Sequence, residues 1–135
     1  MTDAHQHPTL RPGGGRVVVL VGHGGVPKDF PRAKVRRLMT LEAERQARGL
    51  AMTDEERALD EELRRHPRTP RTDPYQAGLE CLASALREQL GGQPLLLAYN
   101  EFCAPSVPEA VQSAIAAGAT EVVLLSSMMT PGGSH

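Results

Sequence analysis

Three short apolar runs recur along the chain, at residues 16–21, 94–99 and 121–127. Unbroken runs of this length, rich in β-branched residues and leucine, predict buried strands that are covered on both faces, as in parallel sheets. The first run ends in Gly22-His23-Gly24-Gly25, and the third is followed by Thr130-Pro-Gly-Gly-Ser-His135. No strand continues through such glycine-rich stretches, so both sequences predict turns where strands end.

Helical patterns separate the three runs. Asp73 followed by Pro74 predicts a helix start, and the apolar stripe that follows comprises Tyr75, Leu79, Leu82, Leu86 and Leu90 before Gly91-Gly92 ends the helix. Ser106-Val-Pro-Glu109 has the form of a capping box, and the buried face predicted after it comprises Val107, Ala110, Val111, Ala114 and Ile115, up to Gly118. Strand, helix, strand, helix, strand predicts an α/β fold, a parallel sheet with flanking helices and right-handed crossovers.

The stretch from Pro31 to Thr72 differs because it holds most of the charged residues of the chain, with both signs mixed. It predicts two helices, roughly 32–48 and 54–65, the second starting from the capping-box pattern Thr53-Asp-Glu-Glu56. Thin apolar seams would come from Val35, Leu38, Met39, Leu59 and Leu63. The segment is either a lid or partner surface, or simply a solvated helical insertion.

The length of 135 residues predicts a single domain. We expect residues 1–15 to be a disordered leader, and residues 16–135 to form one domain with a helical insertion at about 31–72. A net charge of −1 offers no field for nucleic acid or an anionic membrane, and no apolar run is long enough to span a bilayer. Without a secretory signal or a CxxC pair, Cys81 and Cys103 indicate free thiols in the cytoplasm, with Cys81 as a small core residue.

Polar side chains follow each predicted strand: His23 the first, Glu101 the second and His135 the third. The carboxyl ends of parallel strands share one edge of the sheet, so these three groups should converge. Imidazole binds divalent cobalt, nickel, iron and zinc and can accept a proton near neutrality, while a carboxylate can orient the ring or relay the proton.

Glycines surround these groups, and they would let a large flat ligand approach the backbone: Gly22, Gly24, Gly25, Gly132 and Gly133. The alternative for each histidine is an ordinary turn residue, and for Glu101 a surface carboxylate. We assign His5, His7 and His66 to solvent.

Three blocks of sequence resemble the CbiX-type sirohydrochlorin chelatases, which belong with the class II chelatases. They are Val19-Leu-Val-Gly-His-Gly-Gly25, Ala98-Tyr-Asn-Glu-Phe-Cys-Ala-Pro105, and Gly118 to Leu125 with the turn that ends in His135. The resemblance covers residues 16–27 and about 75–135. It implies a flavodoxin-like chelatase half-domain in which His23 and His135 are the active-site histidines and Glu101 is the acidic residue beside them.

The reaction that the resemblance implies is insertion of a divalent metal, cobalt or iron (or nickel), into sirohydrochlorin, in cobalamin or siroheme biosynthesis. The metal is a substrate, held by His23 and His135, and no organic cofactor is needed. Lys28 and Arg32 are candidates to pair with carboxylates of the tetrapyrrole. Family members continue beyond the position of His135, so we expect a truncated or split module that acts as a homodimer or with a second chelatase lobe.

Two further hypotheses remain open. The chain could be a non-catalytic metal- or tetrapyrrole-binding module that keeps the chelatase fold. It could also transfer a phosphoryl group through His23, although histidine phosphatases place an arginine before that histidine and this chain has Gly22 there.

Overall fold

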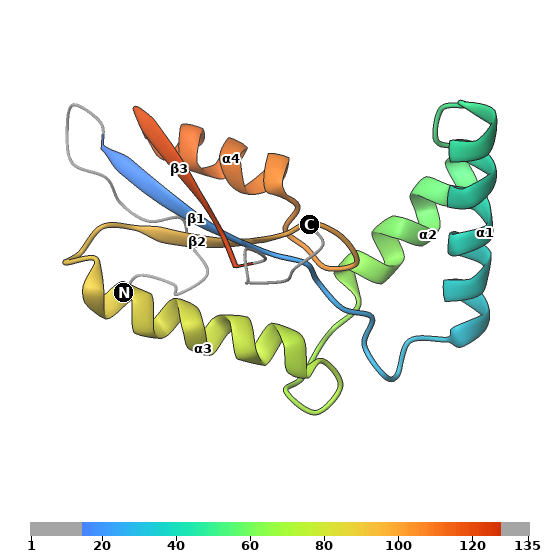
Figure 1. The fold of residues 1–135 in the computed structure, drawn as a ribbon, viewed down its shortest axis with the longest axis horizontal. Helices are drawn as coiled ribbons and strands as arrows, with labels where there is room; N and C mark the ends of the chain where they lie inside the picture. The colour runs from blue at the N-terminus through green and yellow to red at the C-terminus, as the bar shows by residue number, and fades with distance from the viewer. Residues whose placement is uncertain (1–14, 128–135) are drawn as a thin grey trace.

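The computed structural model describes residues 15–127. The elements run β1 (Arg16–Gly22), α1 (Arg32–Arg48), α2 (Asp54–Arg65), α3 (Pro74–Gln89), β2 (Leu95–Tyr99), α4 (Val107–Ala116) and β3 (Glu121–Ser126). The strands form a parallel sheet in the order β2-β1-β3, with β1 in the centre (Figure 1). This confirms the predicted α/β class, and the order matches the first three strands of the flavodoxin-like order 2-1-3-4-5.

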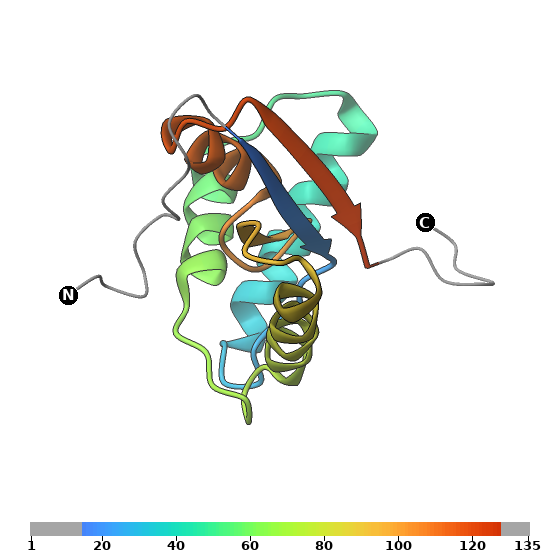
Figure 2. The same cartoon turned by 90° about the vertical axis from the view of Figure 1, so that its left-hand side faces the viewer.

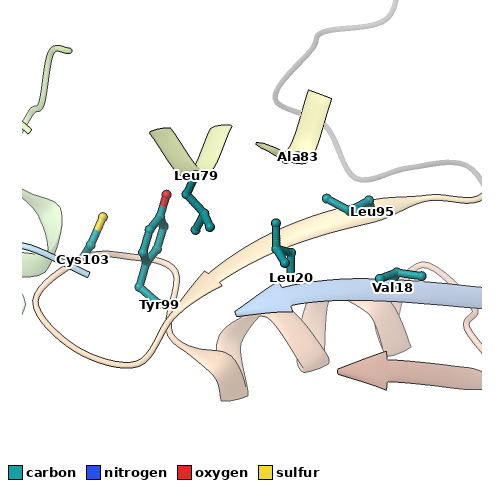
Figure 3. Packing of buried hydrophobic residues seen from close by; sticks show 7 residues of the cluster. All are labelled: Val18, Leu20, Leu79, Ala83, Leu95, Tyr99 and Cys103. Carbon is teal, nitrogen blue, oxygen red and sulfur yellow. The ribbon is translucent and has the colours of Figure 1, made fainter. Parts of the chain in front are cut away.

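The central strand is buried because a helix covers each face of the sheet. Figures 1 and 2 show α3 on one face and α4 on the other. Alternate residues of β1 point to opposite faces, so Val18 and Leu20 pack under α3 against Leu79 and Tyr99 (Figure 3). On the opposite face, the buried cluster comprises Val19, Val21, Ala98 and Ala110.

The predicted helix starts agree with the structure because they depend on local chemistry. The side chains of Asp73 and Ser106 accept backbone N–H groups in the first turns of α3 and α4, and Ser106 forms a complete capping box with Glu109. Thr53 also caps α2 by accepting the Glu56 N–H. The carboxylate of Glu56 does not complete that box, because it binds Arg45 at 2.9 Å instead.

The prediction that every strand is covered on both faces is wrong for β3. Leu124 is 56 % exposed and Leu125 is 43 % exposed. The reason is that β3 is an edge strand of the described sheet, whereas the buried residues of α3 and α4 pack against β1 and β2. Val122 and Val123 of β3 are partly buried against the two clusters.

The apolar helix faces are narrower than predicted. Leu82 on α3 and Ile115 on α4 are exposed, and so is Cys81, which was expected in the core. The residues of α3 that do contact the sheet are Leu79, Ala83, Leu86 and Leu90. The leucine spacing alone had favoured Leu82 as a sheet contact, but Ala83 makes that contact instead. The face of α3 that packs on the sheet is centred one residue further along the helix.

The two charged helices α1 and α2 lie beyond the carboxyl ends of β1 and β2 (Figure 1). Leu38 and Leu63 pack with Phe30 in a separate cluster, so the predicted seam is confirmed for these leucines, while Met39 is exposed. The end of α2 contacts the loop after β2, where the Ala104 N–H donates to Arg64 O at 3.1 Å. None of the helices within residues 15–127 is both long and apolar enough to cross a membrane.

Candidate active site at the carboxyl edge of the sheet

Main-chain hydrogen bonds bring the loop after β1 against the loop after β2. The Asn100 N–H donates to Gly22 O, and the Glu101 N–H donates to His23 O, both at 2.8 Å. These bonds lie at and just beyond the last pair of the strand ladder, Gly22 with Tyr99. His23 and Glu101 are therefore neighbours across the backbone, at the predicted edge of the sheet.

The approach of the two loops depends on glycine at position 24. Gly24 has φ +98°, and a Cβ on it would lie 1.8 Å from the carbonyl oxygen of Glu101. Gly22 is constrained less severely, because its Cβ would meet side-chain atoms, the Tyr75 hydroxyl at 2.7 Å and Leu79 at 2.8 Å. Contacts within the protein explain both glycines, and the ligand-binding role expected for Gly22, Gly24 and Gly25 stays a prediction.

The histidine is fixed through its backbone. The His23 N–H donates to the hydroxyl of Tyr75, on the first turn of α3, at 2.6 Å. His23 is half-buried and Glu101 is exposed. The imidazole-bearing residue is thus held between α3 and the second loop, with its carboxylate neighbour open to solvent.

The end of β3 lies at the same edge. The backbone N–H and the hydroxyl of Ser127 both donate to Val21 O, at 2.9 and 3.0 Å. Residues 128–135 lie outside the described part of the chain, and with them Gly132, Gly133 and His135. The position of the second predicted histidine therefore remains a prediction, although the strand that leads to it ends beside β1.

Arg68, which no sequence pattern singled out, connects the elements of this site. Its side chain is 2 % exposed and donates to Gly25 O at 2.6 Å, to Leu63 O at 2.7 Å and to Asp73 Oδ2 at 2.8 Å. It also donates to Phe102 O. One guanidinium thus joins the loop after His23, the loop after Glu101, the end of α2 and the N-cap of α3.

No local pattern identifies Arg68, because most of its partners are main-chain carbonyls from distant segments. Asp73 was predicted as the N-cap of α3, and its Oδ1 does accept the Gln76 N–H at 3.0 Å. The second oxygen of that carboxylate binds Arg68. The signal in the sequence was an arginine between Pro67 and Pro70, a segment interpreted only as a separator between helices.

Cys103, two residues after Glu101, contributes packing to this site. The thiol is 1 % exposed, and burial raises its pKa, with smaller opposing contributions from nearby arginines. Burial likewise raises the pKa of Tyr99. A protonated, buried thiol is neither a nucleophile nor a thiolate ligand at neutral pH.

His66 was assigned to solvent, and that assignment is wrong. Its Nε2 lies 3.0 Å from Asp29 Oδ1, and its ring stands edge-on to Phe30 with centroids 5.3 Å apart. Its side chain is 23 % exposed. It therefore belongs to the contact between α2 and the loop that precedes α1.

Within residues 15–127, no three histidine, cysteine, aspartate or glutamate side chains gather closely enough to hold a metal ion. The described part of the predicted set comprises one imidazole residue, His23, and one carboxylate residue, Glu101. Two such groups can bind a cation transiently and move protons, and a third donor from outside this part would complete the predicted ligand set.

Comparison with protein families gave one assignment. The model of the CbiX family matches residues 70–135, a segment that contains Glu101 and His135 but begins after His23. Neither the curated proteins nor the solved structures gave a match to the chain. The match covers just under half of the chain, so residues 70–135 are similar to the CbiX family, which is consistent with a class II chelatase.

Proposed function

We propose that the protein inserts a divalent metal ion, cobalt or iron, into sirohydrochlorin. The observation that carries the proposal is the 2.8 Å hydrogen bond from the Glu101 N–H to His23 O. It joins a histidine outside the matched segment to the glutamate within it, at the edge where open α/β sheets bind their ligands.

Metal insertion requires a base as well as a metal ligand. Two pyrrole N–H protons leave the macrocycle as the divalent ion enters, so the macrocycle with its metal keeps the charge of the free ring. An imidazole can deliver the metal or accept a proton, and an exposed carboxylate can pass a proton to water. We assign these steps to His23 and His135, with Glu101 as the proton relay.

The proposed reaction also has consequences for the cofactor, the partner and the compartment. The proposed chemistry uses the metal and the tetrapyrrole as substrates, with no organic cofactor. A large flat substrate at an open sheet edge needs a second surface above it, which a second copy of the chain or another chelatase lobe would provide. Two free cysteines, exposed Cys81 and buried Cys103, are consistent with a reducing cytoplasm, where we place the reaction.

The test is an anaerobic insertion assay that follows the absorbance change of sirohydrochlorin on addition of Co²⁺, Fe²⁺ or Ni²⁺. We expect His23→Ala and Glu101→Gln each to lower the rate by roughly 10²-fold, the lower range for general acid–base groups. Glu88→Gln is the matched control for the glutamate, since Glu88 is an exposed carboxylate on α3. It should leave the rate unchanged.

Two results would contradict the proposal. If the wild-type protein binds sirohydrochlorin without forming the metallated ring, the chain is the non-catalytic binding module. If His23→Ala retains the wild-type rate, the insertion chemistry lies elsewhere in the protein.

A further inference from the structure

A pocket of about 610 Å³ lies between the loop after β1 and the first turns of α1. Its volume falls within the range of small-molecule sites. Its lining combines apolar and cationic side chains: Val26, Pro27, Lys28, Phe30, Arg32, Val35 and Arg36. This composition is suited to a ligand with an apolar body and negatively charged arms.

The charge of this pocket is uncompensated in the described part of the chain. Lys28, Arg32 and Arg36 are exposed and form no ion pair within residues 15–127. The sequence from 26 to 36 contains a single acidic residue, Asp29, and it is hydrogen-bonded to His66. Arg32 and Arg36 stand one helical turn apart, a spacing at which like charges repel, so a bound anion would relieve that repulsion.

A neighbouring pocket also contains cationic side chains, but there they form ion pairs. It lies between α1 and α2 and has a volume of about 360 Å³. Its cations are neutralised, because Lys34 binds Glu62 and Arg37 binds Glu55 through both carboxylate oxygens. On the same helix, therefore, one face has closed ion pairs and the other presents free positive charge.

The apolar side of the pocket is fixed in place. Phe30 is 4 % exposed and belongs to the cluster with Leu38 and Leu63, and Val26 and Val35 pack against that cluster while remaining partly exposed. A rigid apolar edge beside long cationic side chains can bind the rim of a flat ring and pair with its carboxylates at the same time.

The pocket lies close to His23 along the chain. Val26 follows His23 by three residues, so their Cα atoms lie within about 11 Å of each other, the greatest reach of that length of chain. Two hydrogen bonds hold the loop from Gly25 to Lys28 in place. Arg68 donates to Gly25 O at 2.6 Å, and the Lys28 N–H donates to Thr72 O at 2.8 Å. A large ligand held over His23 can therefore extend its arms into the pocket.

We propose that the pocket of Lys28, Arg32 and Arg36 binds carboxylate arms of the tetrapyrrole substrate and so orients the macrocycle over His23. This inference rests on the proposed function for the identity of the ligand. The ligand chemistry itself, several carboxylates on an apolar body, follows from the charge and lining of the pocket.

The test is a fluorescence titration of the full chain with metal-free sirohydrochlorin, which gives Kd without requiring insertion. The matched variants are Arg36→Glu and Arg48→Glu: both arginines are exposed on α1, neither forms an ion pair within residues 15–127, and both changes alter the net charge equally. We expect Kd to rise about tenfold for Arg36→Glu and less than twofold for Arg48→Glu. Lys28→Gln combined with Arg32→Gln should also raise Kd, with unchanged thermal unfolding showing that the variants are folded.

The inference is overturned if Arg36→Glu and Arg48→Glu change Kd equally, or if neither changes it. It is also overturned if the wild-type chain shows no saturable binding. Citrate serves as a free polycarboxylate, and if it binds as tightly as sirohydrochlorin, the pocket takes small acids and the assignment to the macrocycle is wrong. Failure of the proposed function looks different. In that case Arg36→Glu weakens binding while the wild-type chain produces no metallated ring.

Discussion

Removal of Arg68 should destabilise the whole site, and the magnitude follows from its contacts. Its guanidinium is 2 % exposed and the Asp73 side chain beside it is 3 % exposed. Arg68→Met leaves the charge of Asp73 without its cation and removes the side-chain donor from the carbonyls of Gly25 and Phe102. The Leu63 carbonyl loses one of its two donors and keeps the His66 N–H. Breaking a buried ion pair from one side costs about 3–5 kcal/mol, a large part of the roughly 5–15 kcal/mol that stabilises a typical domain.

Urea denaturation followed by circular dichroism measures this loss. With an m-value of about 2 kcal/mol/M, a loss of about 4 kcal/mol lowers the midpoint by about 2 M. Arg71→Met is the matched control, because Arg71 is exposed and forms no ion pair within the described residues. It should change the free energy of unfolding by no more than about 0.5 kcal/mol.

A double-mutant cycle separates the ion pair from the carbonyl contacts. Asp73→Asn keeps an N-cap side chain for α3 while removing the negative charge, so Arg68→Met should cost less in that background than in the wild type. The difference should be on the order of 1–3 kcal/mol, the range for residues in one network. The reasoning is refuted if the stability of Arg68→Met lies within about 1 kcal/mol of that of Arg71→Met, or if the two changes are additive.

Two further predictions concern Gly24 and the two cysteines. Gly24→Ala should destabilise the protein by more than about 1 kcal/mol in the same urea experiment, because its φ of +98° is unfavourable for alanine and the added Cβ meets Glu101 O; a stability equal to the wild type would contradict the close contact between the two loops. Iodoacetamide should label exposed Cys81 in the native protein and reach Cys103 only in urea, since burial raises the pKa of the Cys103 thiol; mass spectrometry showing equal native labelling of both would refute the burial.

Features that depend on local chemistry could be predicted from the sequence. The helix starts at Asp73 and Ser106 follow from side chains that accept N–H groups a few residues away. The strand β1 follows from an unbroken β-branched run, and the strand ends place His23 and Glu101 at one edge. These predictions needed no knowledge of long-range packing beyond the rule for parallel sheets.

Features that depend on the tertiary arrangement could not be predicted in this way. A leucine periodicity does not show whether Leu82 or Ala83 turns toward the sheet, nor that the apolar run of β3 lies at an edge with Leu124 exposed. The role of Arg68 was missed because its acceptors include backbone carbonyls whose positions only the fold determines. Gly24 was assigned to ligand access, and the clash that a Cβ there would make with Glu101 O can be foreseen only when the register of the two loops is known.

The central claim is that His23 and Glu101 lie at one edge and, with His135, handle one divalent cation. The most direct measurement is a crystal structure of the full chain with Co²⁺ bound. We expect the ion in contact with the imidazole of His23, with His135 as a further ligand and the Glu101 carboxylate beside it. A cobalt ion bound elsewhere on the chain, with the His23 side chain turned away from it, would contradict this claim.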